Sequence, residues 1–424
     1  MSREMKYSGI PWIGNIPCTW DVKRIKTIFK ERTELSENGS ETLLSVSEYY
    51  GVANRSEKVA DGEIVSRAES LVGYKKCYQG DLVSNIMLAW KGSMGITDLD
   101  GIVSPAYCVY QPSNKIFPKY YHYLFRTSLY TSIFRLYSKG IIDSRLRLYS
   151  PYFFDIKALI PTKAEQQKIA EFLDRKCSEI DEMVALQEKV IEELKVYKQS
   201  VITEAVTKGL NPDAPKRDSG IEWIGQIPEH WEVKRLKNIF RLKTGTTPDG
   251  FDVVNEDSEI IPWFTPSDIS DECCELHQSE RKLYKSEVGE IELFPKGSLM
   301  FVGIGASAGK LGYSHILGCS NQQITALIPD NCNGKYYYYF LIADRKRLRD
   351  NAFFTTLPII NNGYLSQNKI VYPPISEQQA IADYLDEKCA DIDSLIQTKQ
   401  EKIDSLKEYK KSIIYEYITG KKEI

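Results

Sequence analysis

The most regular pattern of apolar and polar positions lies in two stretches, residues 165–209 and 377–420. In each stretch, apolar residues recur at successive steps of 4, 4, 3, 4, 7, 3, 7 and 4 residues. A period sustained near 3.5 residues is typical of a helix that packs along a second helix as a coiled coil. The pattern therefore predicts two helices of about 45 residues, each roughly 65 Å long.

These apolar positions define a seam that the two helices are expected to share. The seam comprises Ile169, Leu173, Ile180, Val184, Ile191 and Leu194 in the first helix, and Ile381, Leu385, Ile392, Ile396, Ile403 and Leu406 in the second. A solitary helix of this length would expose its apolar stripe to water. We therefore expect the helices to pair, in antiparallel orientation because this relates tandem copies by a pseudo-twofold axis. The alternative is that each helix packs only on its own preceding domain.

Both helices begin with an N-terminal signal. Thr162 and Glu165 have the Thr-x-x-Glu spacing of a capping box, in which the side chains of both residues accept backbone hydrogen bonds. Ser376 and Gln379 repeat this device in the second copy. A glycine closes each stretch, as is typical of a helix C-terminus.

The two helices belong to a repeat that extends over the chain. Residues 8–29 and 219–240 are identical at 15 of 22 aligned positions, and residues 165–181 and 377–393 are identical at 11 of 17. The sequences inside each pair of matching ends differ almost throughout. A matched frame with two divergent inserts predicts one framework that presents two different binding surfaces.

The inserts have the short β-branched runs and turn residues of sheet domains. The expected strands include residues 41–46, 81–88, 102–110, 260–265, 298–304 and 323–328. One tyrosine-rich helix is expected in each insert, at residues 120–137 and 336–351. The predicted fold class is mixed α/β (α+β): two domains with largely antiparallel, irregular sheets, joined by two long helices in an antiparallel coiled coil. The expected parts are a first domain at 1–160, a helix at 161–210, a second domain at 211–373 and a helix at 374–424.

Composition narrows the possible classes of protein. The 424 residues are 42% hydrophobic and 27% charged, as in soluble globular proteins. Since the chain has neither a run of about 18 apolar residues nor an apolar secretory segment at its N-terminus, we expect a cytoplasmic protein without a membrane partner. The nine cysteines form no C-x-x-C pattern, and with only four histidines no zinc-ligand spacing occurs, so no metal site is expected.

The net charge of −3 argues against a broad basic surface that binds nucleic acid unaided. Residues 1–160 nevertheless carry an excess of Lys and Arg over Asp and Glu. If DNA is the ligand, the positive charge must be local or must come partly from a partner protein.

Stretches that imitate enzyme motifs do not fit their required context. Residues 303–308 match a loose G-x-G-x-x-A dinucleotide pattern, but they lack a βαβ unit and an acidic residue about 20 positions later. The Gly309-Lys310 pair has the wrong glycine spacing for a phosphate loop. No Ser/His/Asp grouping stands out, so we expect no catalytic residue in this chain.

The order of motifs, present twice, resembles the specificity (S) subunit of type I restriction–modification systems over essentially the whole chain. The motifs are an SGI-WIG-IP-W opening, a Gly-Asp/Ser-Leu strand, a Gly-rich loop ending at Gly312, an Asn321-Gln322-Gln323 strand, a tyrosine-rich helix, and Pro-Pro-x-x-Glu-Gln-Gln-x-Ile-Ala before a long helix. No single motif is decisive. Their repeated order carries the resemblance.

The resemblance implies a non-catalytic, DNA-binding subunit of a host-defence system. Its two target-recognition domains would each read one half of a bipartite, asymmetric site in double-stranded DNA. The helices would dock methyltransferase subunits, and restriction subunits would join through the complex. The chain itself would hold no cofactor, because S-adenosylmethionine, ATP and Mg²⁺ would belong to the partner subunits, which carry out DNA methylation and cleavage.

Candidate DNA-contacting residues in the inserts have hydroxyl, charged or aromatic side chains that could reach base edges or position the DNA backbone. In the first insert they are Ser45, Ser47, Tyr49, Lys91, Ser93, Lys139, Arg145 and Arg147. In the second they are Thr244, Thr246, Thr247, Thr265, Ser267, Asp268, Ser307, Lys310 and Tyr313. Each of these residue types is more often simply solvated on a surface, so we expect about a third to touch DNA.

Two other functions are open. A free-standing bivalent DNA-binding regulator would share the architecture but lack enzyme partners, and co-purification with a methyltransferase would exclude it. A self-contained methyltransferase or nuclease would need cofactor or metal motifs, and an activity assay on the isolated chain would decide that case. The sequence does not reveal the bases that are read or the length of the spacer between the half-sites.

Overall fold

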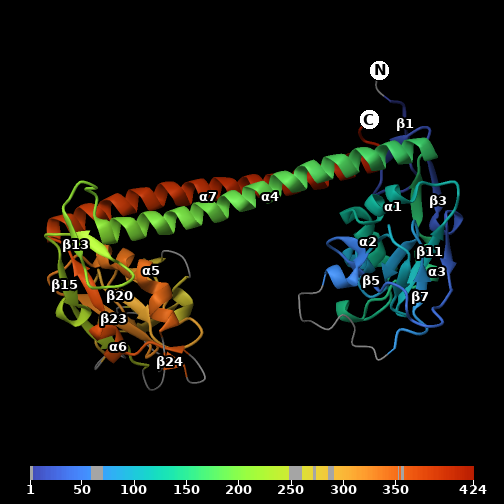
Figure 1. Cartoon of the computed structure of the whole chain (residues 1–424). Coiled ribbons are helices and arrows are strands. Elements are labelled where there is room, and N and C mark those ends of the chain that lie inside the picture. The colour runs from blue at the N-terminus through green and yellow to red at the C-terminus, as the bar shows by residue number, and fades with distance from the viewer. Residues whose placement is uncertain are drawn as a thin grey trace. The chain divides into compact units, whose positions relative to one another are not determined.

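In a computed structural model, the chain forms two compact units (Figure 1). Unit 1 comprises Met1–Glu188 and Glu401–Ile424, and unit 2 comprises Lys189–Gln400. The structure describes residues 3–58, 70–247, 260–270, 274–284, 291–351, 353–354 and 358–424. Each unit contains one sheet domain and a part of each long helix. The four-part division expected from the sequence stays a prediction.

Two long helices, α4 (Lys163–Lys208) and α7 (Ile375–Ile418), supply the frame. Thr162 caps α4 as predicted, because its Oγ1 accepts a hydrogen bond from the Glu165 amide at 3.3 Å. The predicted cap of α7 is wrong, because Ser376 already lies in the first helical turn. The carbonyl of the second proline before α7 accepts bonds from two first-turn amides at 2.9 and 3.0 Å, so this helix starts at the prolines.

The predicted seam is covered along both helices. Ile169, Leu173, Ile180, Ile191, Ile381, Leu385, Ile392 and Ile403 are buried, and Val184, Leu194, Ile396 and Leu406 are half-buried. In unit 1 the Phe172 and Tyr417 rings lie 4.5 Å apart, while Asp181, further along α4, pairs with the earlier α7 residue Lys410 at 2.6 Å. The helices are therefore antiparallel in unit 1, as the sequence predicts. Within each unit they lie side by side (Figure 1).

Unit 1 is built around a four-stranded antiparallel sheet in the order β4-β11-β8-β9. Its strands are β1 (Met5–Tyr7), β2 (Asn15–Pro17), β3 (Asp21–Arg24), β4 (Phe29–Arg32), β5 (Leu44–Ser47), β6 (Gly51–Asn54), β7 (Lys75–Cys77), β8 (Leu82–Asn85), β9 (Met94–Ile96), β10 (Gly101–Val103), β11 (Tyr107–Pro112) and β12 (Lys157–Ile160). The short helices α1 (Pro118–Phe125), α2 (Ser128–Tyr137) and α3 (Ser150–Asp155) supply aromatic side chains to its core. The tyrosine-rich segment is two helices and not one, because Thr127 caps α2 by accepting from the Tyr130 amide at 3.4 Å.

Unit 2 contains a five-stranded sheet in the order β16-β23-β20-β21-β18. Its strands are β13 (Lys216–Asp218), β14 (Gln226–Pro228), β15 (Glu232–Arg235), β16 (Phe240–Thr244), β17 (Ile260–Phe264), β18 (Cys274–Leu276), β19 (Arg281–Tyr284), β20 (Leu299–Val302), β21 (Leu311–Ser314), β22 (Cys319–Ser320), β23 (Ile324–Pro329), β24 (Phe353–Phe354), β25 (Pro358–Ile359) and β26 (Lys369–Tyr372). Its helices are α5 (Gly334–Asp350) and α6 (Asn362–Gln367). Most pairs are antiparallel as predicted, but β18 pairs with β21, and β17 with β22, in parallel.

Each insert begins and ends at one antiparallel strand pair of the frame. In unit 1 this pair is β3–β12, in which Arg24 lies opposite Lys157. In unit 2 it is β15–β26, in which Arg235 lies opposite Lys369. The two ends of an insert are therefore neighbours in space, so an insert can differ in sequence while its frame keeps the same geometry.

The tyrosine-rich helices tie each insert to the frame. In unit 2, the Tyr336 hydroxyl donates to the Val206 carbonyl in α4 at 2.8 Å, and the Tyr339 hydroxyl donates to Asp386 in α7 at 2.6 Å. The matching bonds of unit 1 are Tyr120 to the Ile418 carbonyl at 2.8 Å and Tyr123 to Asp174 at 2.5 Å. Tyr336, Tyr339 and Tyr120 are buried, so these tyrosines pack inside the units.

A buried glutamine in each long helix forms a second tie. Gln166 accepts a hydrogen bond from the Phe117 amide and donates one to the Pro161 carbonyl, both at 2.8 Å. Gln378 makes the equivalent bonds to the Asn333 amide and to a proline carbonyl, also at 2.8 Å. Because a buried amide needs such partners, these bonds explain the second position of the repeated Glu-Gln-Gln motif.

Candidate nucleic-acid interface

Unit 1 presents a basic surface where the 3₁₀ helix η3 (Ala89–Lys91) meets α2. The exposed Lys91 and Arg135 lie against the ring of Trp90, with their charged groups 5.3 and 5.0 Å from its centroid. Arg135 also pairs with Asp143 at 2.7 Å, which ties α2 to the segment that follows it. The structure thus brings the predicted residue Lys91 together with Trp90 and Arg135, which the sequence did not single out.

The segment after α2 is a hairpin-like loop that carries the other predicted basic residues. Lys139 and Arg147 exchange backbone hydrogen bonds at 2.9 Å, which closes the loop. Lys139 also lies over the Tyr152 ring at 4.7 Å, and Arg145 is exposed. At the tip, Ile141 is 98% exposed. A fully exposed isoleucine between basic side chains is a feature that the sequence analysis missed, and no periodic pattern marks it.

The hydroxyl residues predicted in the first insert lie on the hairpin of β5 and β6. The Ser45 hydroxyl is hydrogen-bonded to the Tyr50 hydroxyl at 3.0 Å, and Ser47 accepts a bond from the Tyr49 amide at 3.1 Å. The Tyr49 side chain is exposed. Ser93, by contrast, is 1% exposed and donates to a β5 carbonyl at 3.2 Å, so its hydroxyl supports the hairpin and does not face solvent.

In unit 2 the predicted loop after β16 packs directly against the loop before β23. The Thr246 amide donates to the Ser320 carbonyl at 2.8 Å, and the Thr247 hydroxyl donates to Gln322. A Cβ on Gly245 would lie 2.2 Å from the Ser320 hydroxyl, so only glycine allows the loops to approach this closely. The Thr244 hydroxyl accepts a bond from the Asn362 amide group at 2.8 Å.

These contacts create a polar edge composed of hydroxyl and amide groups. Besides the three threonines it contains Asn321, Gln322, Gln323 and Asn362. Gln322 is exposed, and Gln323 accepts a hydrogen bond from Asn321 at 3.0 Å. The Asn-Gln-Gln run is one of the motifs that carry the family resemblance, but it was not among the contact residues predicted from the sequence. Its amides are the groups best suited to hydrogen-bond base edges.

A second predicted group in unit 2, around the 3₁₀ helix η6 (Pro266–Asp268), has a role within the fold. The Thr265 amide and hydroxyl both donate to the same Asp268 oxygen, at 2.7 and 2.8 Å, while the other oxygen accepts from the Glu280 amide at 2.8 Å. Both carboxylate oxygens therefore have partners inside the unit. Ser267 is exposed, and its hydroxyl lies 2.8 Å from that of Thr265.

The remaining predicted residues lie elsewhere in unit 2. Ser307 and Lys310 are half-buried in the turn that joins β20 to β21. These strands are antiparallel neighbours, so the Gly-rich sequence is a hairpin turn and not the βαβ crossover of a dinucleotide site. Tyr313, on β21, lies 4.9 Å from the Lys335 ammonium and 5.0 Å from the His315 ring.

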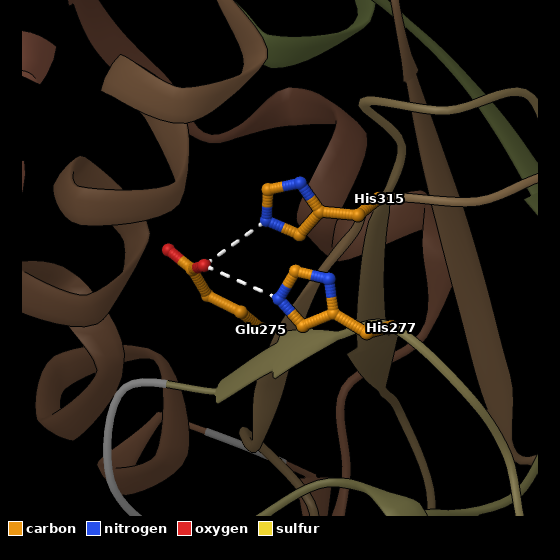
Figure 2. A group of neighbouring side chains, drawn as sticks. All are labelled: Glu275, His277 and His315. Atoms are coloured by element: carbon orange, nitrogen blue, oxygen red, sulfur yellow. Dashed lines mark hydrogen bonds and ion pairs between the residues drawn. The ribbon is translucent and has the colours of Figure 1, made fainter.

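Beside Tyr313 the structure gathers three side chains that the histidine spacing in the sequence did not connect: Glu275, His277 and His315 (Figure 2). One nitrogen of each imidazole and one carboxylate oxygen all lie within 4.8 Å of one another. The parallel pairing of β18 and β21, which the sequence analysis did not predict, brings them together.

Another histidine, His122 in unit 1, has a role within the fold. Its Nδ1 accepts a hydrogen bond from the Ile96 amide at 3.4 Å. Burial, together with the nearby charges of Arg126 and Lys119, lowers the pKa of His122 to about 3, so its imidazole is neutral near pH 7. This residue supports the sheet and is not exposed for contact with a ligand.

Comparison with known proteins identifies the family. The family model for the type I restriction modification DNA specificity domain matches residues 17–196 and 228–419. The MjaVIII specificity subunit of Methanocaldococcus jannaschii is 24% identical over an alignment of 441 positions, which covers 96% of this chain and 93% of that relative. The MjaIX specificity subunit of the same organism is 30% identical over 192 residues, 43% of this chain and 42% of that relative. The EcoKI specificity subunit of Escherichia coli is 25% identical over 309 residues, 68% of this chain and 62% of that relative.

Solved structures share the fold. A chain from a study of complex assembly and conformational transition of the type I R-M system aligns with a TM-score of 0.74 at 17% identity, over 95% of this chain and 98% of that chain. The HsdS subunit from Thermoanaerobacter tengcongensis aligns with a TM-score of 0.58 at 17% identity, over 96% of this chain and 98% of that chain. Because the family model covers most of both units, this chain belongs to the family of type I restriction–modification DNA specificity subunits.

Proposed function

We propose that each unit of this chain reads one half of a bipartite, asymmetric site in double-stranded DNA, on behalf of a type I restriction–modification complex. The observation that carries the proposal is the contrast between frame and insert. Tyr336 and Tyr120 make equivalent bonds to the long helices, whereas the surfaces presented by the two inserts differ in chemistry. A common frame with unlike surfaces suits two half-sites of different sequence.

The chemistry of the surfaces supports different contacts in the two halves. In unit 1, Lys91, Arg135 and Lys139 offer cations beside aromatic rings, which suits contact with phosphates and unstacked bases. In unit 2, the exposed Gln322 offers an amide that can donate and accept at once, as adenine recognition in the major groove requires. Unit 2 would thus depend more on base edges, and unit 1 more on the DNA backbone.

The long helices carry matched exposed apolar side chains that fit a repeated partner. Tyr197 and Tyr409, 212 positions apart, are 59% and 56% exposed, and Met183 and Leu395, with the same separation, are 42% and 51% exposed. Each unit therefore presents one tyrosine and one aliphatic residue of the set. Exposed apolar groups of this kind are enriched at protein interfaces. We assign them to the docking of two methyltransferase subunits, one on each unit, with restriction subunits joining through the complex.

In this proposal the chain selects DNA and leaves the chemistry to its partners. S-adenosylmethionine would be bound by the methyltransferase subunits, which must take the target base out of the duplex to modify it. ATP and Mg²⁺ would be used by the restriction subunits. Activity assays of the isolated chain and of the complex test this division, since methylation by the chain alone would contradict it.

The decisive experiment exchanges one insert. The residues between Arg24 and Lys157 are replaced by the corresponding insert of a related subunit, which keeps the β3–β12 pair intact. The variant is expressed with its methyltransferase, and the methylated motif is read by methylome sequencing. One half-site should change and the other should persist. The reciprocal exchange between Arg235 and Lys369 should alter only the other half.

A motif that changes in both halves, or in neither, would contradict the two-reader model. Failure of the chain to co-purify with any methyltransferase, while it still binds DNA, would instead favour a free-standing bivalent regulator.

Salt titration adds a second test: Lys139→Ala should reduce the slope of log affinity against log salt by about 1, whereas Gln322→Ala should leave that slope unchanged and relax the sequence preference.

A further inference from the structure

The side chains of Glu275, His277 and His315 lie on one exposed edge of the five-stranded sheet in unit 2. β18 is the edge strand and pairs in parallel with β21, with Glu275 opposite Tyr313. The His315 amide donates to the Leu276 carbonyl at 2.9 Å, which continues the pairing beyond β21 and sets His315 beside His277. Glu275 is two positions before His277, so both side chains project from the same face of the extended chain.

The geometry directs both imidazoles at one carboxylate oxygen (Figure 2). The Nε2 atom of His315 lies 3.1 Å from Oε2 of Glu275, and Nε2 of His277 lies 3.7 Å from the same oxygen. The two rings are stacked, with centroids 4.3 Å apart and planes inclined by 9°. Rotation about the ring torsion, which is soft in histidine, would let both nitrogens converge on a point next to the carboxylate.

The surrounding charges favour a cation. The second oxygen of Glu275 accepts a bond from Lys335, and Lys335 is also paired with Asp386 at 3.2 Å. Glu275, Asp386 and Lys335 together contribute a formal net charge of −1 beside the two imidazoles. The bond from Lys335 holds the Glu275 carboxylate in position beside the imidazoles.

We propose that Glu275, His277 and His315 form a binding site for a divalent transition metal ion, with Zn²⁺ as its ion and water completing the coordination. Two imidazoles and one carboxylate are a donor set suited to Zn²⁺. Such an ion would join the edge strand to β21 at the end of their short pairing. It would thereby stabilise this edge of unit 2, independently of the proposed reading of DNA.

Accessibility supports loading of the site after folding. The His277 side chain is 65% exposed and that of Glu275 is 40% exposed, so an ion can reach the donors from solvent. Lys335 remains bonded to the carboxylate oxygen that the histidines do not face, in the manner of an outer group that orients a ligand. Because His277 is exposed, its replacement should leave the core of unit 2 intact.

The test uses the full chain, stripped with EDTA and kept reduced. ZnCl₂ is titrated by calorimetry into the wild type and into His277→Ala, His315→Ala and the control His230→Ala, which removes another histidine of unit 2. The wild type should bind one Zn²⁺ ion, and its melting temperature should be higher with Zn²⁺ than without it. Loss of either site histidine should weaken binding on the order of a hundredfold and abolish the thermal shift. The control should behave as wild type.

Spectroscopy identifies the donors. The Cu²⁺-loaded chain should show hyperfine coupling to two imidazole nitrogens, and the coupling to one nitrogen should disappear in His277→Ala. The Co²⁺-loaded chain should show no thiolate charge-transfer band. Absence of Zn²⁺ binding, binding that the two histidine variants retain, or a thiolate band that accounts for the bound ion would each overturn the proposal. None of these outcomes depends on DNA binding, so failure here leaves the proposed function intact.

Discussion

The Lys198 ammonium lies 2.7 Å from the Asp393 carboxylate within unit 2, and Lys410 makes the equivalent contact with Asp181 at 2.6 Å within unit 1. In both cases the partners come from opposite long helices, and each residue lies 212 positions from its counterpart in the repeat. The two ion pairs thus repeat one contact in both units. The two lysines lie within the seven-residue steps of the seam, at positions where an apolar residue is skipped, so these polar residues have a structural role.

Reversing the charge of Lys198 should weaken unit 2. In Lys198→Glu the new carboxylate would face Asp393, and we expect the free energy of unfolding to fall by about 1 kcal/mol because the pair is only partly shielded from water. Urea denaturation followed by circular dichroism measures the effect. The double variant Lys198→Glu/Asp393→Lys restores opposite charges and should recover most of the loss. If it is no more stable than the single variant, the ion pair is not the cause.

Replacement of the buried Gln166 should reduce the free energy of unfolding far more than replacement of its exposed neighbour Gln167. Gln166→Ala leaves the Phe117 amide and the Pro161 carbonyl without their partner in a buried place, and we expect a loss of about 2 kcal/mol. Gln167→Ala is the matched control, because Gln167 is exposed and donates a hydrogen bond to Glu171 of the same helix, so its replacement should cost less than about 0.5 kcal/mol. Equal losses in the two variants would contradict the proposed tie.

The lowered pKa of His122 predicts that the free energy of unfolding decreases at acidic pH. Between its usual pKa of 6.5 and the folded value of about 3, the unfolded chain binds a proton that the folded chain does not. Stability should therefore be complete above pH 6.5 and should fall as pH drops, by at most about 1.4 kcal/mol per pH unit from this group. His122→Asn keeps an acceptor for the Ile96 amide but cannot titrate. Its stability should decline less steeply from pH 6.5 to about pH 4, and an identical slope in both proteins would contradict the assignment.

The frame was predictable because its signals are local and repeated. The steps of apolar residues such as Leu173 and Leu385 identify the long helices, and both side chains are fully buried as expected. Most predicted strands were also found, because alternating β-branched runs mark them directly. The strand predicted at residues 102–110 was wrong, because a turn divides it into β10 and β11, which belong to different sheets. The cap at Ser376 was wrong because the preceding prolines already fix the start of the helix, an effect that competes with side-chain capping.

The candidate surfaces were less predictable because they depend on contacts between distant segments. Ser93 follows a basic residue in a loop, as a contact residue would, yet its hydroxyl is used by a neighbouring strand. Asp268 is likewise engaged within the fold. Gln322 lies in a motif that the sequence reveals, but only the packing of the loop at Gly245 shows that it belongs to a polar edge. Patterns over a few neighbouring residues in the sequence do not predict which loops contact one another in the fold.

The exposed tyrosines of the long helices predict the stoichiometry of the complex. Tyr409→Glu in unit 1 or Tyr197→Glu in unit 2 puts a charge into one of the two proposed docking surfaces. Each single variant should bind one methyltransferase copy where the wild type binds two, and the double variant should bind none, as measured by native mass spectrometry. Tyr7→Glu is the control, because Tyr7 is exposed but lies outside the long helices. Two bound copies in either single variant would contradict the assignment of these surfaces.

The exposed tip of the loop in unit 1 predicts a contribution to DNA binding that is apolar rather than ionic. Ile141 and Ile142 are solvent-exposed beside Arg145, within the loop that the backbone bonds of Lys139 and Arg147 close. Apolar side chains held next to phosphate-binding cations can wedge against a base step, and unstacking of such a step is repaid by closer contact with the bent duplex.

Replacing the tip residue separates this contribution from charge. Ile141→Ser should weaken binding of the methylated motif by roughly 1 kcal/mol or more, about a fivefold loss of affinity, without altering the salt dependence. Its melting temperature should match that of the wild type, because the side chain has almost no contact with the rest of the unit. Val196→Ser, an exposed apolar change on α4, is the control and should bind DNA normally. Fluorescence anisotropy at several salt concentrations measures both quantities. If Ile141→Ser binds as tightly as the control, the tip does not touch the duplex, and the basic residues at the base of the loop alone account for its role.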